Sequence, residues 1–167
     1  MEKSGKKDQG GRKITEVKTF SIPFNLEATK ENNTSATHPP DKPSKEQIIN
    51  QALKFHSQGN IPEATRYYQQ IITQGCNDYR VFSNYGAILR GLGQLKKAEE
   101  STRKAIELNP DLADLHSNLG IILKDLGKLK EAELSLRKAN KIKPDFADAQ
   151  SNLGIILKDL GKLKEAE

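Results

Sequence analysis

One sequence of 17 residues, SNLGIILKDLGKLKEAE, occurs twice in this chain without a single difference. The two copies span residues 117–133 and 151–167, so they lie 34 residues apart. Exact self-similarity at a fixed period is the signature of a repeat architecture, and a 34-residue period is typical of units built from two helices. This repeat constrains the fold more than any other feature of the chain, and it predicts a stack of helix pairs.

From Lys45 onwards the chain divides into units of this length: 45–78, 79–112, 113–146 and the incomplete 147–167. In the third unit, apolar residues recur at helical spacing in two stripes. The first stripe is Leu115, Leu119, Ile122 and Leu126, and the second is Leu129, Ala132, Leu136 and Ala139. Gly127 lies between the stripes, where a glycine can adopt the left-handed conformation that ends a helix. The predicted fold class is therefore all-α, a helix-turn-helix solenoid of about 3.5 repeats.

Two positions of every unit hold a small residue. They are Ala52, Gly86, Gly120 and Gly154 in the first helices, and Ala64, Ala98, Ala132 and Ala166 in the second helices. Glycine inside a helix costs about 1 kcal/mol relative to alanine. Its recurrence therefore predicts a steric need, which is most simply a close approach of the paired helix.

Residues 1–44 precede the repeats, and we interpret them as a disordered polar leader. The leader is rich in polar residues, glycine and proline, so it cannot bury enough apolar surface to offset the entropy of ordering. One apolar island, Phe20–Leu26, either docks onto the repeats or a partner, or is a chance cluster. Ser44 then opens the first helix as an N-cap, with Gln47 completing a capping box.

Composition argues against several classes of function. The net charge is +5 with acids and bases interleaved, a balance that argues against nucleic acid as a partner. Cys76 is the only cysteine, so no internal disulfide can form and a thiolate metal site is not expected. No apolar run has the length of a membrane span, and the N-terminus lacks the apolar segment of a secretory signal. We therefore expect a cytoplasmic protein that does not associate with membranes.

No catalytic, cofactor or metal site is expected in these residues. His38, His56 and His116 lie far apart in the sequence and lack the spacing of metal ligands. His56 is expected on a groove-facing helix face, as an ordinary surface histidine. The chain is therefore predicted not to be an enzyme by virtue of these residues.

The units resemble the tetratricopeptide repeat (TPR) family. Its motif favours large residues at positions 4, 11 and 24, Leu-Gly at 7 and 8, Ala at 20 and 27, and Pro at 32. The third unit matches these positions with His116, Leu119, Gly120, Leu123, Ala132, Leu136, Ala139 and Pro144. The second unit matches them with Phe82, Tyr85, Gly86, Leu89, Ala98, Thr102, Ala105 and Pro110. The first unit matches fewer, with Ala52, Phe55, Ala64, Tyr68 and Ile71. The chain departs from the motif at Cys76, where proline is usual, and at position 4, where His116 and Gln150 replace a large apolar residue.

The resemblance implies a right-handed superhelix whose first helices line a concave groove that holds peptides or partner proteins. Positions 2, 5, 6, 9, 12 and 13 of each unit face that groove in the family. In the third unit they are Asp114, Ser117, Asn118, Ile121, Lys124 and Asp125, and in the fourth they are Asp148, Ser151, Asn152, Ile155, Lys158 and Asp159.

Asparagine occupies position 6 in three units, as Asn84, Asn118 and Asn152. This series resembles the asparagine ladder of O-linked N-acetylglucosaminyl transferases, whose amides clamp a peptide main chain. An amide offers both a donor and an acceptor to a main chain, which suits that role. The alternative is that these asparagines only bond neighbouring helices. A family groove that binds C-terminal carboxylates through Lys and Arg is set aside, because Ile49 and Leu53 occupy the matching positions.

We therefore expect a non-catalytic scaffold that binds a protein or peptide in the groove. The alternative function is to present substrates to a transferase of the glycosyltransferase, sulfotransferase or oxygenase type, as in bacterial TPR-transferase fusions, with the catalytic domain truncated. The break inside a helix after Ala166 favours that alternative. It also predicts fraying from Ala147, or self-association through the C-terminal end. The residues expected to be partly exposed there are Leu153, Ile156, Leu157 and Leu160.

Overall fold

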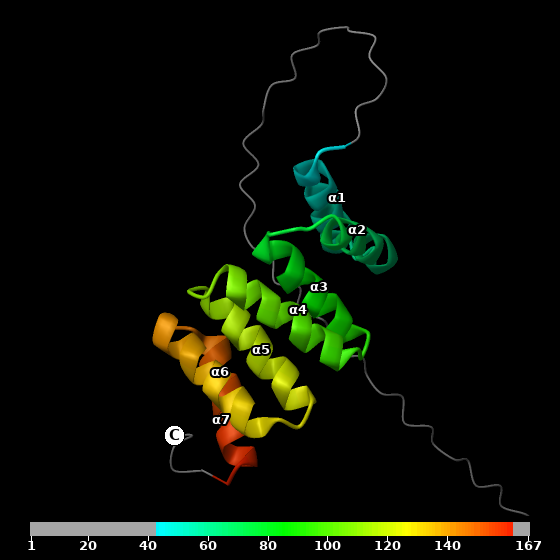
Figure 1. Ribbon diagram of the computed structural model, residues 1–167. Helices are drawn as coiled ribbons and strands as arrows, with labels where there is room; N and C mark the ends of the chain where they lie inside the picture. The colour runs from blue at the N-terminus through cyan, green and yellow to red at the C-terminus, as the bar shows by residue number, and fades with distance from the viewer. Residues whose placement is uncertain (1–42, 162–167) are drawn as a thin grey trace, which may run out of the picture. The chain divides into compact units, whose positions relative to one another are not determined.

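A computed structural model describes residues 43–161, which lie within one compact unit of the chain (Figure 1). These residues form seven α-helices and no strand, which confirms the all-α prediction. The helices are α1 (Lys45–Ser57), α2 (Ile61–Thr73), α3 (Tyr79–Gly91), α4 (Leu95–Leu108), α5 (Ala113–Asp125), α6 (Leu129–Ile142) and α7 (Ala147–Asp159). Residues 1–42 of the leader, with its island Phe20–Leu26, and Ala166 in the last unit lie outside the described residues.

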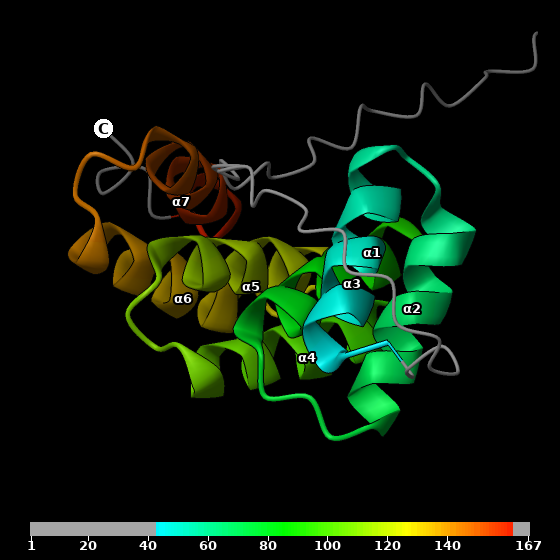
Figure 2. The ribbon, with the colours of Figure 1, turned by 90° about the horizontal axis from the view of Figure 1, so that it is seen from above.

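The helices pack as consecutive pairs, α1 with α2, α3 with α4, and α5 with α6. Each even-numbered helix also packs against the odd-numbered helix that follows it. The odd-numbered helices α3, α5 and α7 contact one another in turn, and Figure 2 shows them on the same side of α4 and α6. Because α1, α3, α5 and α7 begin 34 residues apart, equivalent side chains recur from one of these helices to the next.

Local chemistry sets where the helices start and stop. Ser44 Oγ accepts a hydrogen bond from the Gln47 backbone N–H at 3.2 Å, and Gln47 Oε1 accepts one from Ser44 N–H at 2.7 Å. This pair is the capping box that the sequence predicted. The predicted helix-ending glycine is confirmed as well, since Gly127 has a φ of 75°, a left-handed conformation that other residues rarely adopt.

Small residues allow the paired helices to approach closely. A Cβ atom built on Gly120 would lie 2.6 Å from Leu136 Cγ, and one built on Gly86 would lie 2.6 Å from Thr102 Oγ1. Ala64, on the second helix of the first pair, is completely buried. The predicted steric need is therefore confirmed at the α3–α4 and α5–α6 contacts.

In the third and fourth units, the unusual residue at position 4 contacts the backbone of the proline that precedes the unit. His116 Nε2 lies 2.8 Å from the Pro110 carbonyl oxygen, and Gln150 Nε2 donates to the Pro144 carbonyl oxygen at 2.6 Å. Both contacts connect the first turn of an odd-numbered helix to the turn that precedes it. A polar side chain that bonds the backbone therefore stands where the family has a large apolar residue.

The apolar residues that α7 exposes differ from those that the sequence predicted to be exposed. Ile156 and Leu157 are buried, so the expectation that both would be partly exposed is wrong. Leu153 and Leu160 pack against the cluster that α5, α6 and α7 share. The reason is that α7 rests on α5 and α6 through this apolar stripe. The large apolar residue that α7 exposes is Ile155, with 45% of its surface accessible.

Candidate peptide-binding groove

The position-6 asparagines lie on the odd-numbered helices, and the bonds they make are local. Asn84 Nδ2 donates to the Arg80 carbonyl oxygen at 2.9 Å, and Asn152 Nδ2 donates to the Asp148 carbonyl oxygen at 2.8 Å. Both acceptors belong to the asparagine's own helix, four residues earlier, rather than to a neighbouring helix. Within the described residues, the side-chain oxygens of these two amides accept no hydrogen bond, so both can accept one from a ligand.

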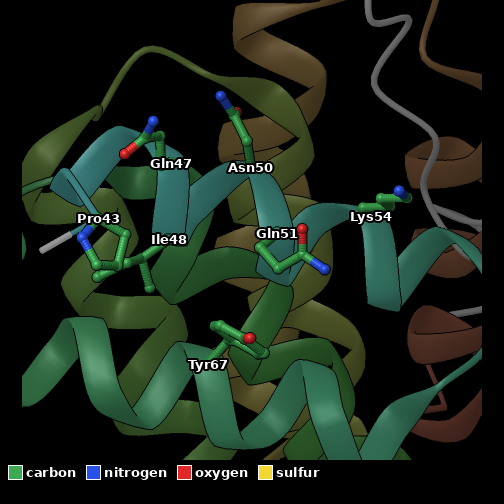
Figure 3. A pocket seen from close by; sticks show the side chains of 7 residues that line it. All are labelled: Pro43, Gln47, Ile48, Asn50, Gln51, Lys54 and Tyr67. Carbon is green, nitrogen blue, oxygen red and sulfur yellow. The ribbon is translucent and has the colours of Figure 1, made fainter. Parts of the chain in front are cut away.

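A fourth asparagine belongs to the series, and the sequence interpretation missed it. Asn50 precedes Asn84 by the same 34-residue offset, so the repeat alone could have identified it. Asn50 is exposed on α1 and lines an open pocket of about 470 Å³ between α1 and α2 (Figure 3). The asparagine series therefore consists of Asn50, Asn84, Asn118 and Asn152, one on each odd-numbered helix.

The other predicted groove residues differ in exposure. Ile121, Asp114 and Lys124 on α5 are half-buried, whereas their counterparts Ile155, Asp148 and Lys158 on α7 are exposed. Ser117 is 1% exposed, so its prediction as a groove residue is wrong for this structure, while Ser151 is exposed. The reason is that α5 has odd-numbered neighbours on both sides, α3 and α7, whereas α5 is the one odd-numbered helix that α7 contacts among those described.

Two ion pairs join neighbouring odd-numbered helices. Arg90 Nε of α3 lies 2.6 Å from Asp125 Oδ2 of α5, so the Asp125 carboxylate already has a partner. Arg80 bonds Asp78 and also lies 3.5 Å from Glu46 of α1. The hydrogen bond with Asp78 raises the pKa of Arg80, which therefore stays charged. In residues 43–161, no ion pair involves Asp114, Lys124, Asp148, Lys158 or Asp159.

His56 does not lie free on a helix face as expected. Its Nδ1 atom is 3.3 Å from the Tyr68 hydroxyl of α2, and the two rings meet edge to face with centroids 6.0 Å apart. Tyr68 is completely buried, so the imidazole belongs to the α1–α2 contact. Burial lowers the pKa of His56, because it disfavours the charged imidazolium.

This burial predicts that the protein loses stability in mild acid. Below the ordinary histidine pKa of about 6.5, the unfolded chain binds a proton that the folded chain does not. We expect the free energy of unfolding to fall as the pH drops through that value, by at most about 1.4 kcal/mol per pH unit. Urea unfolding between about pH 7.5 and 5.5 measures this slope, and His56→Gln should flatten it. An unchanged slope in that variant would contradict the assignment.

Within residues 43–161, no group of three or more His, Cys, Asp or Glu side chains could hold a metal ion. None of the helices in this part of the chain is long and apolar enough to cross a membrane.

Comparison with known proteins identifies the repeats. Residues 50–167, more than half of the chain, match a family model described as the cilia and flagella-associated protein 70 middle TPR-like domain. No curated protein matches the chain in sequence.

Several solved structures share the fold at low sequence identity. The crystal structure of MamA has 20% identity and a TM-score of 0.70, over 73% of this chain and 71% of MamA. The first TPR of Spaghetti (RPAP3), bound to an HSP90 peptide, has 21% identity and a TM-score of 0.66, over 70% of this chain and 93% of that one. The O-GlcNAc transferase of Thermobaculum terrenum has 23% identity and a TM-score of 0.62, over 68% of this chain but 22% of the transferase.

Proposed function

The chain belongs to the family of the cilia and flagella-associated protein 70 middle TPR-like domain, and from that membership we propose a non-catalytic interaction module. It binds an extended peptide across α1, α3, α5 and α7. The observation that carries the proposal is the asparagine series, which places the same amide at the same position of four successive odd-numbered helices.

The spacing of the series suits a main chain. Packed helices lie about 8–10 Å apart, and an extended chain advances about 3.3 Å per residue. Asn84, Asn118 and Asn152 lie on helices that contact one another in turn. They would therefore meet the peptide at about every third residue and cover about seven residues. Because the amides bond backbone groups rather than side chains, affinity would depend little on sequence, and neighbouring groove residues would supply selectivity.

The bound HSP90 peptide of the RPAP3 structure supports a peptide ligand, since it shows that a TPR of this fold can hold one. The family takes its name from a protein of cilia and flagella, so peptides from such proteins are the first ligands to test.

Presentation of substrates to a transferase is the second candidate function. It is supported by the likeness to the TPR-containing O-GlcNAc transferase, of which these repeats would match only one region. In this alternative the same asparagine series would hold the substrate polypeptide, and the chemistry would belong to a separate domain.

We expect Asn118→Ala to weaken peptide binding about fivefold, because one amide–backbone hydrogen bond contributes about 1 kcal/mol. A peptide selected from a displayed random library serves as the ligand, and its affinity is measured by fluorescence anisotropy. Asn77→Ala, at an exposed site in the α2–α3 loop, is the matched control and should change nothing. Unchanged affinity together with a lowered melting temperature for Asn118→Ala would assign the residue a structural role instead.

A further inference from the structure

Two successive junctions between even-numbered helices differ in how they are bridged. Between α4 and α6, Arg103 Nη2 lies 3.0 Å from Glu131 Oε2, and Nζ of Lys128, the N-cap of α6, lies 2.8 Å from Glu99 Oε2. One repeat earlier, between α2 and α4, the equivalent residues are Gln69, Lys97, Gln94 and Thr65. Within residues 43–161, no ion pair joins α2 to α4. The α2–α4 junction therefore lacks both bridges of its neighbour, and of the four charges it keeps a single cation.

A pocket of about 280 Å³ lies at this unbridged junction. Its floor is apolar and aromatic, and consists of Ile72 from α2 and Phe82, Tyr85 and Leu89 from α3. Phe82 is half-buried, whereas its equivalent one repeat later, His116, is buried. Tyr85 is half-buried as well, whereas its equivalent Leu119 is buried. Because a cavity of about 150 Å³ can hold benzene, the pocket has room for one large apolar side chain.

The polar side chains beside this floor already have partners. Ser101 Oγ donates to the Phe82 carbonyl oxygen at 2.8 Å. Gln69 Nε2 donates to the Tyr85 hydroxyl at 3.0 Å. The floor of the pocket therefore favours an apolar group, whose transfer from water is the main source of binding energy there.

The rim of the pocket belongs to α4 and is charged. It comprises Lys97, Glu100 and Lys104. Lys104 Nζ lies 2.8 Å from Glu107 Oε2, so this ammonium already has a carboxylate. Lys97 Nζ donates to the neutral Gln94 Oε1 at 3.1 Å, and in the described part of the chain it has no ion-pair partner. An external carboxylate can therefore pair with Lys97, whereas Glu100 would repel it.

We propose that the pocket bounded by α2, α3 and α4 docks a segment of a partner protein in which one large apolar side chain is flanked by acidic residues. The apolar side chain fills the pocket over Phe82 and Tyr85, and a carboxylate of the segment pairs with Lys97. None of the residues that line the pocket holds position 2, 5, 6, 9, 12 or 13 of its unit. This docking surface is therefore separate from the asparagine series, and it exists whether or not the groove binds a peptide.

The probe for the test is an acetylated pentapeptide amide with phenylalanine at its centre and glutamate at the other positions. It is titrated into the isotope-labelled full chain, and amide chemical shifts are followed. We expect saturable shifts centred on α4 and on the pocket residues of α3. Lys97→Gln should raise the Kd about threefold, as expected for one exposed ion pair. Glu100→Gln should lower the Kd by a similar factor, because it removes a repulsion.

Two control peptides separate the apolar contribution from the charged one. Replacing the phenylalanine by alanine should abolish binding, because nothing then fills the pocket. Replacing the glutamates by lysines should weaken binding, because Lys97 then meets a like charge.

The next repeat suggests a variant that closes the pocket. Gln69→Arg with Lys97→Glu installs at the α2–α4 junction the residues that form the Arg103–Glu131 ion pair. This double variant should weaken binding more than Lys97→Gln does, since it adds a bridge and reverses the charge. The matched control is Arg103→Gln with Glu131→Lys, which makes the opposite exchange at the α4–α6 junction and should leave the Kd unchanged.

Thermal unfolding checks that every variant is folded. Asn118→Ala should not alter the Kd of this pentapeptide, so a failure here is distinguishable from a failure of the groove to bind its own ligand. Four results would each overturn the proposal: no shifts on α4 at millimolar peptide, equal binding of the lysine peptide, loss of binding in Asn118→Ala, or pocket shifts that change with protein concentration alone. The last of these would assign the pocket to a second copy of the chain.

Discussion

Leu136→Ala is expected to lower the free energy of unfolding by about 4 kcal/mol, near the upper end for a leucine truncation. Leu136 is completely buried on α6, where its side chain packs against the bare Cα of Gly120. Glycine has no side chain that could move into the space, so the variant would leave a cavity between α5 and α6. Urea unfolding followed by circular dichroism measures the loss.

Leu134→Ala is the matched control on the same helix. Leu134 is 69% exposed, two residues before Leu136, so truncating it should change the free energy of unfolding by less than about 0.5 kcal/mol. The two variants alter helix propensity equally, and their difference therefore isolates packing. Equal effects from both would mean that the α5–α6 contact contributes little.

Gly120→Val is expected to destabilise the protein by about 2–3 kcal/mol, because overpacking forces neighbours out of their rotamers or moves the backbone. The new Cβ would lie 2.6 Å from Leu136 Cγ and 3.3 Å from the Ala132 carbonyl oxygen. The first atom is the branch point of a buried side chain and the second is backbone, so neither can move aside at low cost.

Gly91→Val serves as the control, since a Cβ at Gly91 meets no atom within 4 Å. We expect it to leave stability unchanged or slightly higher, because valine favours a helix more than glycine does. The double variant Gly120→Val with Leu136→Ala should be less destabilised than the sum of its parts, because the shortened side chain makes room for the valine. Strict additivity would contradict the direct contact between the two sites.

The sequence by itself determined the fold class and the ends of the helices. Both follow from chemistry within a few residues: Ser44 and Gln47 satisfy each other's backbone groups, and Gly127 supplies the left-handed turn. The 34-residue period then identified equivalent positions, from which the asparagine series could be found, although Asn50 was overlooked. Such features are local or periodic, so they do not depend on how the helices pack.

The tertiary structure alone decided which of these residues a ligand can reach. Ser117 and Ser151 are followed by identical residues as far as 125 and 159, yet Ser117 is buried and Ser151 is exposed. Likewise, Ile156 and Leu157 are buried by α5 and α6, although the sequence around them suggested an open end. His56 bonds Tyr68 across the helix pair for the same reason. The exposure of a residue depends on the neighbouring helix, and the sequence of a segment does not specify which helix packs against it.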